Sequence, residues 1–260
     1  MNKIKLMNKI KVGIIGCGFV GGALKAWLEE NNAENCECRV SDPPKGFNDD
    51  LSKIDIAFLQ IHVPTEDDGT QDLTLMKELI KKLPDVPVFV RTTILPGTSD
   101  MLSKETGHKV HYMPEFLTER THIEDFRKQT MVFTGAVELL SRIFVGKKFA
   151  VMTPLEAEIT KYAHNVFGAY KVTYFNAVKE YCEKMGARWA TVHAGCLLSG
   201  YINEMHTVVP GPDGRMGYGG KCFPKDVNAF AKMTEGTPLG TLLAPLHELN
   251  VHFRGAEERV

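Results

Sequence analysis

A glycine-rich turn between a buried strand and a helix constrains this chain more than any other feature of its sequence. Residues 11–15 form an apolar run typical of a buried strand, and residues 20–30 have the pattern of the helix that follows. Between them stand Gly16, Gly18 and Gly21. In such a pattern the first glycine permits a tight turn, the second lets the backbone approach a phosphate, and the third lets helix and strand pack closely. The sequence therefore predicts a strand–turn–helix unit whose helix N-terminus can bind an anionic group.

Strand and helix patterns alternate over the N-terminal part of the chain, up to about residue 152. Apolar runs predict strands at 11–15, 37–40, 54–61, 86–91, 109–113 and 131–134. Helical apolar spacing and helix stop signals predict helices at 20–30, 73–83, 99–106 and 136–144. Repeated strand–helix units predict an α/β fold, a Rossmann-type doubly wound parallel sheet with helices on both faces.

The chain changes character at Thr153. The sequence Thr153-Pro154-Leu155-Glu156 matches a capping box with proline at the first helical position, so a long helix should begin there and end near Gly186. Beyond it the patterns are helical, except for a loop at 208–222 that is rich in glycine and proline. We therefore expect two domains, a sheet domain at 1–152 and a smaller, mostly helical domain at 153–260 that the long connecting helix opens.

The charge balance and the cysteine content argue against several kinds of partner. With 31 basic and 32 acidic residues among 260, the formal net charge is −1, so we expect no nucleic-acid partner bound through bulk charge. No apolar run approaches the roughly 20 residues that span a bilayer, and no secretory signal pattern opens the chain, so we expect no membrane partner and a cytoplasmic location. The six cysteines are then expected as thiols, and none has the spacing or the histidine neighbours of a metal site.

An acidic residue makes the glycine turn more specific. Asp42 follows the second expected strand, about 20 residues after the turn. A carboxylate in this position can accept a hydrogen bond from a ribose 2′-hydroxyl and repels a 2′-phosphate, so domain 1–152 is expected to bind NAD rather than NADP. Lys45, close in the sequence, weakens that preference slightly. The expected cofactor residues of the turn are Gly16, Gly18, Phe19, Val20 and Gly21.

A second glycine-rich segment, 217–226, carries the cysteine with the most informative surroundings. Its sequence is Gly-Tyr-Gly-Gly-Lys-Cys-Phe-Pro-Lys-Asp. The glycines allow the backbone to approach a ligand, and Cys222 stands where a following helix would begin. A helix N-terminus and neighbouring lysines favour the thiolate, which is the nucleophilic form of cysteine. Asp226 lies four residues further on, so it can share the helix face of Cys222 or point back toward it.

This segment resembles the catalytic-cysteine motif of the UDP-glucose and GDP-mannose dehydrogenase family, and other similar stretches occur in the family's order. They are Val63-Pro64-Thr65, 92–98, Pro114-Glu115-Phe116-Leu117-Thr118-Glu119, 161–165 and Asn250. The resemblance covers almost the whole chain. Members of the family carry a further C-terminal domain that supplies much of the nucleotide-sugar contact, and we expect this chain to lack it.

The resemblance implies NAD-dependent oxidation of a sugar primary alcohol to the carboxylate, a reaction of polysaccharide biosynthesis, with a sugar or nucleotide sugar as substrate. Cys222 would form a thiohemiacetal and then a thioester with the substrate. The implied catalytic residues are Cys222, Lys161, Asn165, Asp226, Glu115 and Thr93. The implied cofactor residues beyond the glycine turn are Asp42, Val63, Pro64, Thr65, Thr93 and Glu119. The implied substrate residues are Phe116, Leu117, Thr118, Lys161, Asn165, Tyr218 and Gly219.

Two other interpretations stay open. A single-step dehydrogenase of the 3-hydroxyacid or phosphogluconate type would share the Rossmann domain, the long helix and the Lys161–Asn165 spacing, but it gives no reason for Cys222 in a glycine loop. A non-catalytic NAD-binding module would give no reason for Cys222, Lys161, Asn165 and Glu115 to occur together.

The long helix also predicts a homodimer. Its apolar residues Val166, Tyr170, Phe175 and Val178 could form a seam with a second copy. The same residues could equally be buried within one chain.

Overall fold

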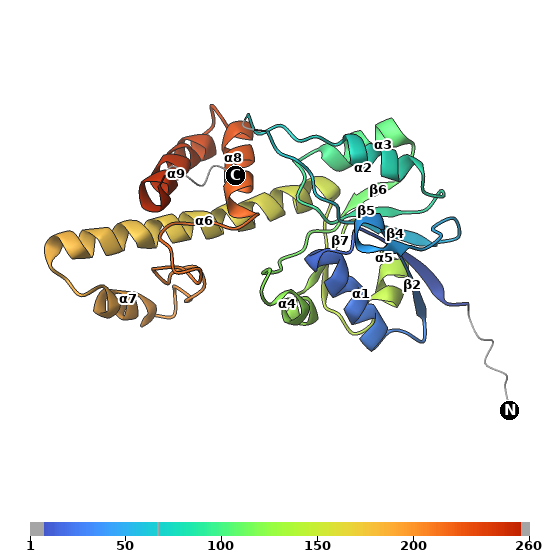
Figure 1. Cartoon of the computed structure of the whole chain (residues 1–260), viewed down its shortest axis with the longest axis horizontal. Coiled ribbons are helices and arrows are strands. Elements are labelled where there is room, and N and C mark those ends of the chain that lie inside the picture. Colours follow the sequence, from blue (N-terminus) through green and yellow to red (C-terminus); the bar gives the residue numbers. More distant parts are fainter. Residues whose placement is uncertain (1–7, 67, 256–260) are drawn as a thin grey trace. The chain divides into compact units, whose positions relative to one another are not determined.

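The chain folds into two compact units (Figure 1). The structure, a computed structural model, describes residues 8–66 and 68–255. Unit 1 comprises Met1–Pro64 and Gln71–Lys161, and unit 2 comprises Thr65–Thr70 and Tyr162–Val260. The domain boundary expected at residue 153 coincides with the start of helix α6 (Pro154–Met185) and stays a prediction.

Unit 1 is built on a parallel-dominated sheet of six strands in the order β3-β2-β1-β4-β5-β6. All neighbouring pairs are parallel except β2 and β3, which are antiparallel. The strands are β1 (Ile10–Ile15), β2 (Cys36–Asp42), β3 (Phe47–Asn48), β4 (Ile56–Leu59), β5 (Val88–Val90) and β6 (Val110–Tyr112). The order reverses direction between β1 and β4, and the glycine turn follows β1 at that point, where open α/β sheets bind ligands.

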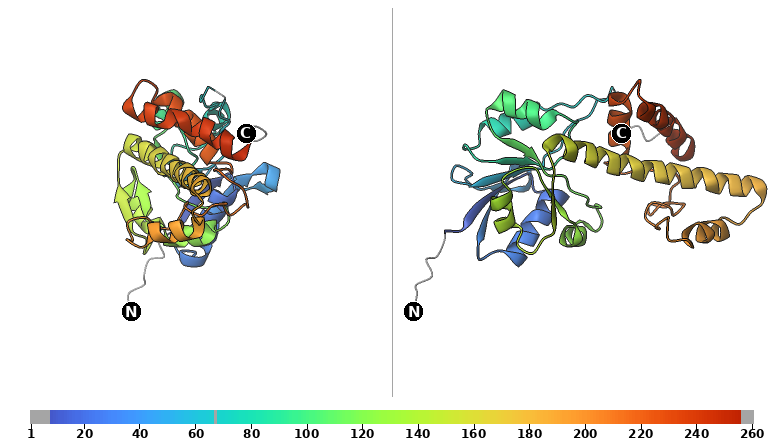
Figure 2. Two further views of the ribbon diagram at one scale, coloured as in Figure 1. Left: turned by 90° about the vertical axis from the view of Figure 1, so that its left-hand side faces the viewer. Right: turned by 180° about the vertical axis from the view of Figure 1, so that it is seen from behind.

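Helices cover both faces of this sheet (Figures 1 and 2). On one face lie α1 (Phe19–Asn31), α4 (His122–Lys128) and α5 (Val137–Ile143), and on the other lie α2 (Thr74–Lys81) and α3 (Thr98–Thr106). Strand β4 explains the two cores, because successive side chains of a strand point to opposite faces. Ile56 and Phe58 belong to the core under α1, whereas Ala57 and Leu59 belong to the core under α2. The fold class expected from the sequence is confirmed.

Three elements of unit 1 lack a clear sequence signal. Strand β7 (Met131–Phe133) was expected, but its parallel partner β8 (Phe149–Val151) was not, and both ends of β8 are exposed. Helix α4 buries one residue, Phe126, so it has no helical apolar stripe. The two-residue strand β3 is exposed, and it follows a short 3-10 turn, η1 (Pro43–Lys45).

Unit 2 is helical. It contains α6 from Tyr162 onward, α7 (Trp189–Leu197), α8 (Phe223–Met233) and α9 (Pro238–Arg254). The capping box at the start of α6 forms as predicted, with Glu156 N–H donating to Thr153 Oγ1 (3.3 Å) and Thr153 N–H donating to Glu156 Oε2 (2.7 Å). Gly186, with φ +71°, follows the last turn of the helix. Within residues 8–66 and 68–255, no helix combines the length and the apolar character needed to cross a bilayer.

Candidate functional site

The glycine turn of unit 1 is shaped by the chain's own backbone. Gly16 has φ +84°, and a Cβ atom there would lie 2.5 Å from the carbonyl oxygen of Gln60. A Cβ atom on Gly21 would collide with the carbonyl oxygen of Gly16. At Gly18, the N-cap of α1, the nearest atom to an added Cβ is Lys45 Nζ at 3.8 Å. The first and third glycines are therefore required by packing, and the second leaves one side of the turn open.

Asp42 lies against this turn. Its Oδ2 accepts a hydrogen bond from the Cys17 N–H (2.7 Å), and Lys45 Nζ lies 3.8 Å from the same oxygen and donates to the Cys17 carbonyl (2.8 Å). The helix N-terminus offers N–H groups that have no partner within the helix, as a pyrophosphate requires. An open glycine turn with an acidic residue beside it fits the adenosine half of NAD. Phe19 and Val20 form the first turn of α1 above it.

The other expected cofactor residues of unit 1 follow the carboxyl ends of neighbouring parallel strands. Val63 and Pro64 follow β4, and Thr93 follows β5. Val63 and Thr93 are buried, and the Thr93 carbonyl accepts a hydrogen bond from Gln71 Nε2 (3.2 Å). Glu119, by contrast, lies in an exposed loop after β6. Thr65 belongs to the short segment of the chain that is part of unit 2.

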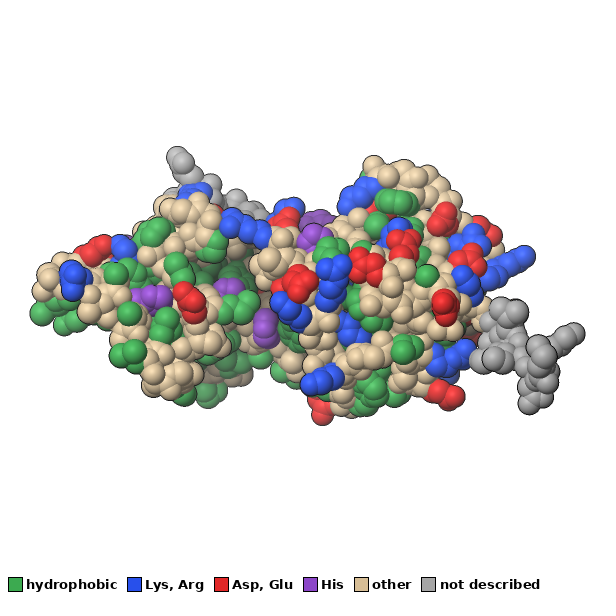
Figure 3. Space-filling view, turned by 90° about the horizontal axis from the view of Figure 1, so that it is seen from below, with side chains coloured by type: hydrophobic (Ala, Val, Ile, Leu, Met, Phe, Trp, Pro, Cys, Tyr) green, Lys and Arg blue, Asp and Glu red, His purple; other side chains and the backbone are tan. Residues whose placement is uncertain are grey.

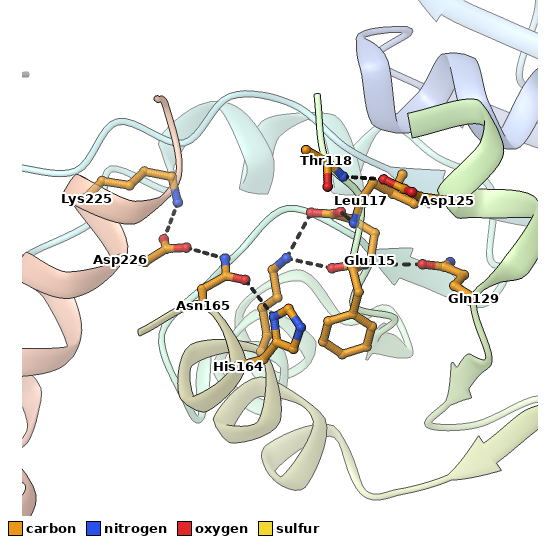
Figure 4. Close-up of polar contacts among 11 residues, drawn as sticks. Glu115, Leu117, Thr118, Asp125, Gln129, His164, Asn165, Lys225 and Asp226 are labelled. Carbon is orange, nitrogen blue, oxygen red and sulfur yellow. Dashed lines mark hydrogen bonds and ion pairs between the residues drawn. The ribbon is translucent and has the colours of Figure 1, made fainter. Parts of the chain in front are cut away.

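Glu115 and Lys161 form a buried ion pair within unit 1 (Figure 4). Lys161 Nζ donates to the Glu115 carbonyl oxygen (2.6 Å) and to Oε1 (3.1 Å), and both side chains are less than a tenth exposed. The other carboxylate oxygen of Glu115 accepts from the Leu117 N–H (2.8 Å). Burial makes each charge depend on the other, since an unpaired charge in such a place is strongly unfavourable. The pair holds the Lys161 ammonium group against the loop that follows β6.

The expected substrate residues after β6 lie on a loop whose backbone is fixed by the next helix. Phe116 N–H donates to Gln129 Oε1 (3.2 Å), and Thr118 N–H donates to Asp125 Oδ2 (2.8 Å). The ring centroid of Phe116 lies 5.5 Å from Lys161 Nζ. Phe116 and Leu117 are half-buried, and Thr118 is exposed.

Arg91 is a charged residue at this sheet edge that the sequence analysis did not single out. Its side chain is completely buried, and its Cζ lies 5.3 Å from the centroid of the Phe126 ring. Within the described part of the chain, Nε and Nη2 have no hydrogen-bond partner. Burial lowers the pKa of Arg91 to about 10, and the negative charge of Glu115 partly opposes this. The available signal was a charged residue that ends an otherwise apolar strand run.

In unit 2, Asn165 and Asp226 form a second buried polar pair (Figure 4). Asn165 Nδ2 donates to Asp226 Oδ2 (2.7 Å), and Lys225 Nζ pairs with the other carboxylate oxygen of Asp226. Asp226 is fully buried and Asn165 is 5% exposed. His164 Nδ1 lies 3.1 Å from Asn165 Oδ1. Asn165 on α6 therefore fixes the orientation of the Asp226 carboxylate on α8.

Cys222 occupies the N-cap position of α8, as the sequence predicted. It is half-buried, and the structure records it as a thiol, like the other five cysteines. The Asp226 N–H donates to the Cys222 carbonyl (3.0 Å), so the carboxylate lies one helical turn after the thiol. Unit 2 thus brings Cys222, Asp226 and Asn165 into one local arrangement.

Tyr218 and Gly219, which were expected to bind substrate, pack against α9 instead of standing open. Tyr218 is buried, its hydroxyl donates to the Leu246 carbonyl (3.3 Å), and burial raises its pKa. A Cβ atom on Gly219 would collide with the guanidinium of Arg254. Side chains of α9 thus fill the space that a Cβ atom would need at Gly217 and Gly219, and the expectation that these glycines admit a ligand stays a prediction.

The structure distinguishes between the two positions, a dimer seam or the interior of one chain, that the sequence left open for the apolar residues of the long helix. Val166 and Phe175, expected in a dimer seam, are buried inside unit 2, and Tyr170 and Val178 are half-buried. A different face of α6 is exposed and apolar. Its exposed residues Phe167, Tyr174 and Tyr181 recur every seven positions.

A doubly wound sheet with a glycine turn after its first strand defines a class of protein, those with a Rossmann-type domain. In this chain such a domain is joined to a helical unit that carries a cysteine at a helix N-terminus. Residues 155–250 match the central domain of the UDP-glucose/GDP-mannose dehydrogenase family. The chain belongs to this family, as the motifs predicted.

Individual relatives agree with this assignment. A UDP-glucose 6-dehydrogenase of Rickettsia felis is 28% identical over 209 residues, a match that covers 73% of this chain and 46% of that protein. One from Rhizobium meliloti is 31% identical over 220 residues, covering 73% of this chain and 49% of that protein. The chain therefore spans about half the length of the curated relatives it matches.

Solved structures show the same fold. The structure of a UDP-glucose dehydrogenase from Pyrobaculum islandicum superposes with a TM-score of 0.78 at 22% identity, covering 97% of this chain and 70% of that one. A UDP-D-ManNAc dehydrogenase from Pyrococcus horikoshii gives a TM-score of 0.72 at 17% identity, covering 94% of this chain and 68% of that one.

Proposed function

We propose that this chain carries out NAD-dependent oxidation of the primary alcohol of a nucleotide sugar to the carboxylate, through a thioester on Cys222. UDP-glucose is the first substrate to test, because the curated relatives are named UDP-glucose 6-dehydrogenases. The observation that carries the proposal is the arrangement in unit 2, where Cys222 begins α8 and Asn165 orients the Asp226 carboxylate one turn later.

The cofactor residues of unit 1 fit NAD. Gly16, Gly18 and Gly21 with the N-terminus of α1 would hold the pyrophosphate, and Asp42 would accept from the adenosine ribose. When bound, NAD would accept one hydride in each oxidation, so that two NAD would be consumed for each sugar acid formed.

In the first oxidation, the alcohol carbon loses a hydride and its hydroxyl loses a proton, which gives an aldehyde. Lys161 and Asp226 would assist the base that accepts this proton. The Cys222 thiolate then adds to the aldehyde carbon, so that a C–S bond forms and the carbonyl oxygen becomes an oxyanion that takes up a proton. N–H donors on Lys161 and Asn165 would stabilise that oxyanion, a contribution of roughly 3–4 kcal/mol per donor in comparable sites.

In the second oxidation, the thiohemiacetal loses a hydride from carbon and a proton from oxygen, which gives a thioester. Water then attacks the thioester carbon, the C–O bond forms, and the C–S bond breaks to return the thiolate and release the carboxylate. Glu115 and Thr93 would orient this water. The two protons of the water pass to solvent as the carboxylate and the thiolate form.

We also propose a homodimer formed through α6. Hydrophobic side chains reach the surface in several places (Figure 3). The exposed large hydrophobic residues of α6 include Phe167, Tyr174 and Tyr181. Their seven-residue spacing is typical of a helix that packs against a second helix. Tyr174→Glu should shift the sedimentation coefficient to that of a monomer, and an unchanged coefficient would contradict the seam.

The test of the activity is a set of nucleotide sugars, UDP-glucose first, assayed with the purified chain for NADH and sugar acid. Two NADH per sugar acid are expected, and one NADH per substrate would favour the single-step alternative. Cys222→Ser should abolish acid formation and keep NADH binding, whereas Cys196→Ser, in α7, should leave both intact. Acid formation by Cys222→Ser at the wild-type rate would remove the thioester from the mechanism.

A further inference from the structure

Side chains of helix α9 form hydrogen bonds with the backbone of the glycine segment that precedes Cys222. The Asn250 side chain bonds to both backbone groups of Tyr218. Its Oδ1 accepts from the Tyr218 N–H (2.8 Å), and its Nδ2 donates to the Tyr218 carbonyl (3.0 Å). A side-chain amide that satisfies both backbone groups of one residue fixes the path of the chain there. The Tyr218 ring adds a buried contact, since its hydroxyl reaches the Leu246 carbonyl of the same helix.

Arg254, one helical turn after Asn250, holds the residues just before Tyr218. Its Nη1 donates to the carbonyl oxygens of Met216 (3.0 Å) and Gly217 (3.4 Å), and its Nη2 pairs with the Asp213 carboxylate. The Arg254 side chain is only 5% exposed. The rigid guanidinium fork can make these contacts together, which the single ammonium of a lysine cannot.

The glycines of the segment are complementary to these two side chains. A Cβ atom on Gly217 would lie 2.5 Å from Asn250 Oδ1, and one on Gly219 would collide with Arg254 Nη2. Gly219 does not have a positive φ, so its need for glycine comes from the space that Arg254 occupies. Gly220 differs, since nothing lies within 4 Å of an added Cβ and its φ is +77°. Two of the three glycines are therefore explained by α9.

A third contact comes from α6. The buried side chain of Asn176 accepts from the Gly217 N–H through Oδ1 (2.9 Å). The segment is thus fixed at Gly217 and Tyr218, and the chain is fixed again where α8 begins at Phe223. Only four residues, Gly219 to Cys222, connect the two fixed points.

From these contacts we propose that Asn250 and Arg254 are positioning residues for the Cys222 thiol: α9 sets the path of the segment and so holds the sulfur at the N-terminus of α8. That the position of the Cys222 sulfur matters for catalysis rests on the proposed function. The positioning itself is a property of unit 2 that can be measured without substrate or cofactor.

The experiment measures how fast iodoacetamide alkylates Cys222 in the full 260-residue chain, with Cys196 in the same molecule as internal standard. Peptide mass spectrometry gives both rates over a series of pH values. Gly219→Ala should slow the alkylation of Cys222 relative to that of Cys196 by roughly fivefold at neutral pH, and it should shift the pH profile of Cys222 alkylation upward. The reason is that the added methyl group displaces the Arg254 clamp, by which we mean the contacts of Arg254 with Asp213, Met216 and Gly217. Gly22→Ala is the matched control, since nothing lies within 4 Å of a Cβ atom there.

A double variant separates positioning from general damage to the fold. Arg254→Ala removes the clamp but also makes room for the methyl group, so Gly219→Ala combined with Arg254→Ala should behave like Arg254→Ala alone. Asn250→Asp, which keeps the Oδ1 acceptor and loses the Nδ2 donor, should lie between wild type and Asn250→Ala. If Gly219→Ala and Arg254→Ala lower the melting temperature but leave the pH profile of Cys222 unchanged, the clamp is structural only and the proposal is wrong.

The outcome is independent of whether the proposed activity is correct. A wild-type chain that forms no sugar acid with any nucleotide sugar would count against the proposed function, and the alkylation profiles would still show whether α9 positions the thiol. Arg254→Lys serves where Arg254→Ala does not fold, since a lysine can keep the Asp213 pair and loses the simultaneous contacts to Met216 and Gly217.

Discussion

The two glycine segments look alike in the sequence and are held in different ways in the structure. In unit 1, the atoms that exclude a side chain at Gly16 and Gly21 are backbone carbonyl oxygens. In unit 2, the atoms that exclude a side chain at Gly217 and Gly219 belong to side chains of α9, more than thirty residues away in the sequence. The need for a glycine that nearby backbone imposes can be predicted from a local sequence motif. A glycine that is required by a distant side chain cannot be distinguished in the sequence from a glycine that leaves room for a ligand.

The largest effect is expected where backbone excludes the side chain. Gly16→Ala combines a positive φ with a Cβ atom 2.5 Å from the Gln60 carbonyl, so the free energy of unfolding should fall by roughly 2–5 kcal/mol. Gly46→Ala has nearly the same φ, +80°, and open space around it, so it should cost only about 1–2 kcal/mol. Urea unfolding followed by circular dichroism measures both. Equal losses would mean that φ alone requires glycine at position 16.

A smaller effect is expected at the corresponding position in unit 2. Gly217→Ala has φ +70° and meets Asn250 Oδ1, which belongs to a side chain that can rotate away, so the loss should be roughly 2–3 kcal/mol. Gly214→Ala, with φ +77° and nothing within 4 Å, isolates the backbone strain at about 1–2 kcal/mol. Hydrogen exchange of α9 amides would show whether the difference arises there. Unperturbed α9 amides in Gly217→Ala would contradict the contact.

These differences also explain which parts of the fold and site could be predicted. The glycine turn, the capping box at Thr153 and the position of Cys222 at the start of α8 depend on residues within a few positions of each other, and all three appear as the sequence indicated. The strand–helix alternation was enough to give the fold class, because strands in a doubly wound sheet are buried apolar runs.

What could not be predicted depends on contacts between distant segments. The spacing of apolar residues on α6 does not show which face the rest of the chain covers, so the sequence left open whether Val166 and Phe175 lie at an interface or are buried within unit 2, as they are in the structure. Strand β8 is a run of only three apolar residues whose two ends are exposed, and it forms through its pairing with β7. The roles of Asn250 and Arg254 beside Cys222 depend on how α9 folds back, which the local sequence does not contain.

Helix caps test the comparison between the two units further, because in both units the capping side chain bonds to a backbone N–H only three residues away. Thr153 caps α6 by accepting from the Glu156 N–H (3.3 Å), and Thr237 caps α9 by accepting from the Gly240 N–H (3.1 Å). Thr153→Ala and Thr237→Ala should each lower the free energy of unfolding by about 1 kcal/mol. Thermal denaturation of the two variants provides the test. A loss several times larger for Thr237→Ala would show that α9 is held mainly by its first turn and not by its contacts with Tyr218.

The smallest effect concerns two half-buried histidines, His111 in unit 1 and His206 in unit 2. Burial lowers the pKa of His206 below 6.5, and the positive charges of Lys171 and His164 lower it further. Burial also lowers the pKa of His111, but there the Thr134 carbonyl opposes the shift.

Since the unfolded chain binds the proton more readily, stability is fully present above pH 6.5 and is lost as the pH falls from 6.5 toward the folded pKa. His206→Asn, which tolerates the positive φ of 65° at this position, should therefore flatten the acid side of a plot of urea midpoint against pH. His111→Asn should flatten it less, because the Thr134 carbonyl, 3.2 Å from His111 Nδ1, opposes the lowering of the His111 pKa by burial and by the charge of Lys109. If the plots of urea midpoint against pH run parallel for His206→Asn and wild type, His206 takes up a proton as readily in the folded chain as in the unfolded chain. Its pKa is then not lowered by folding.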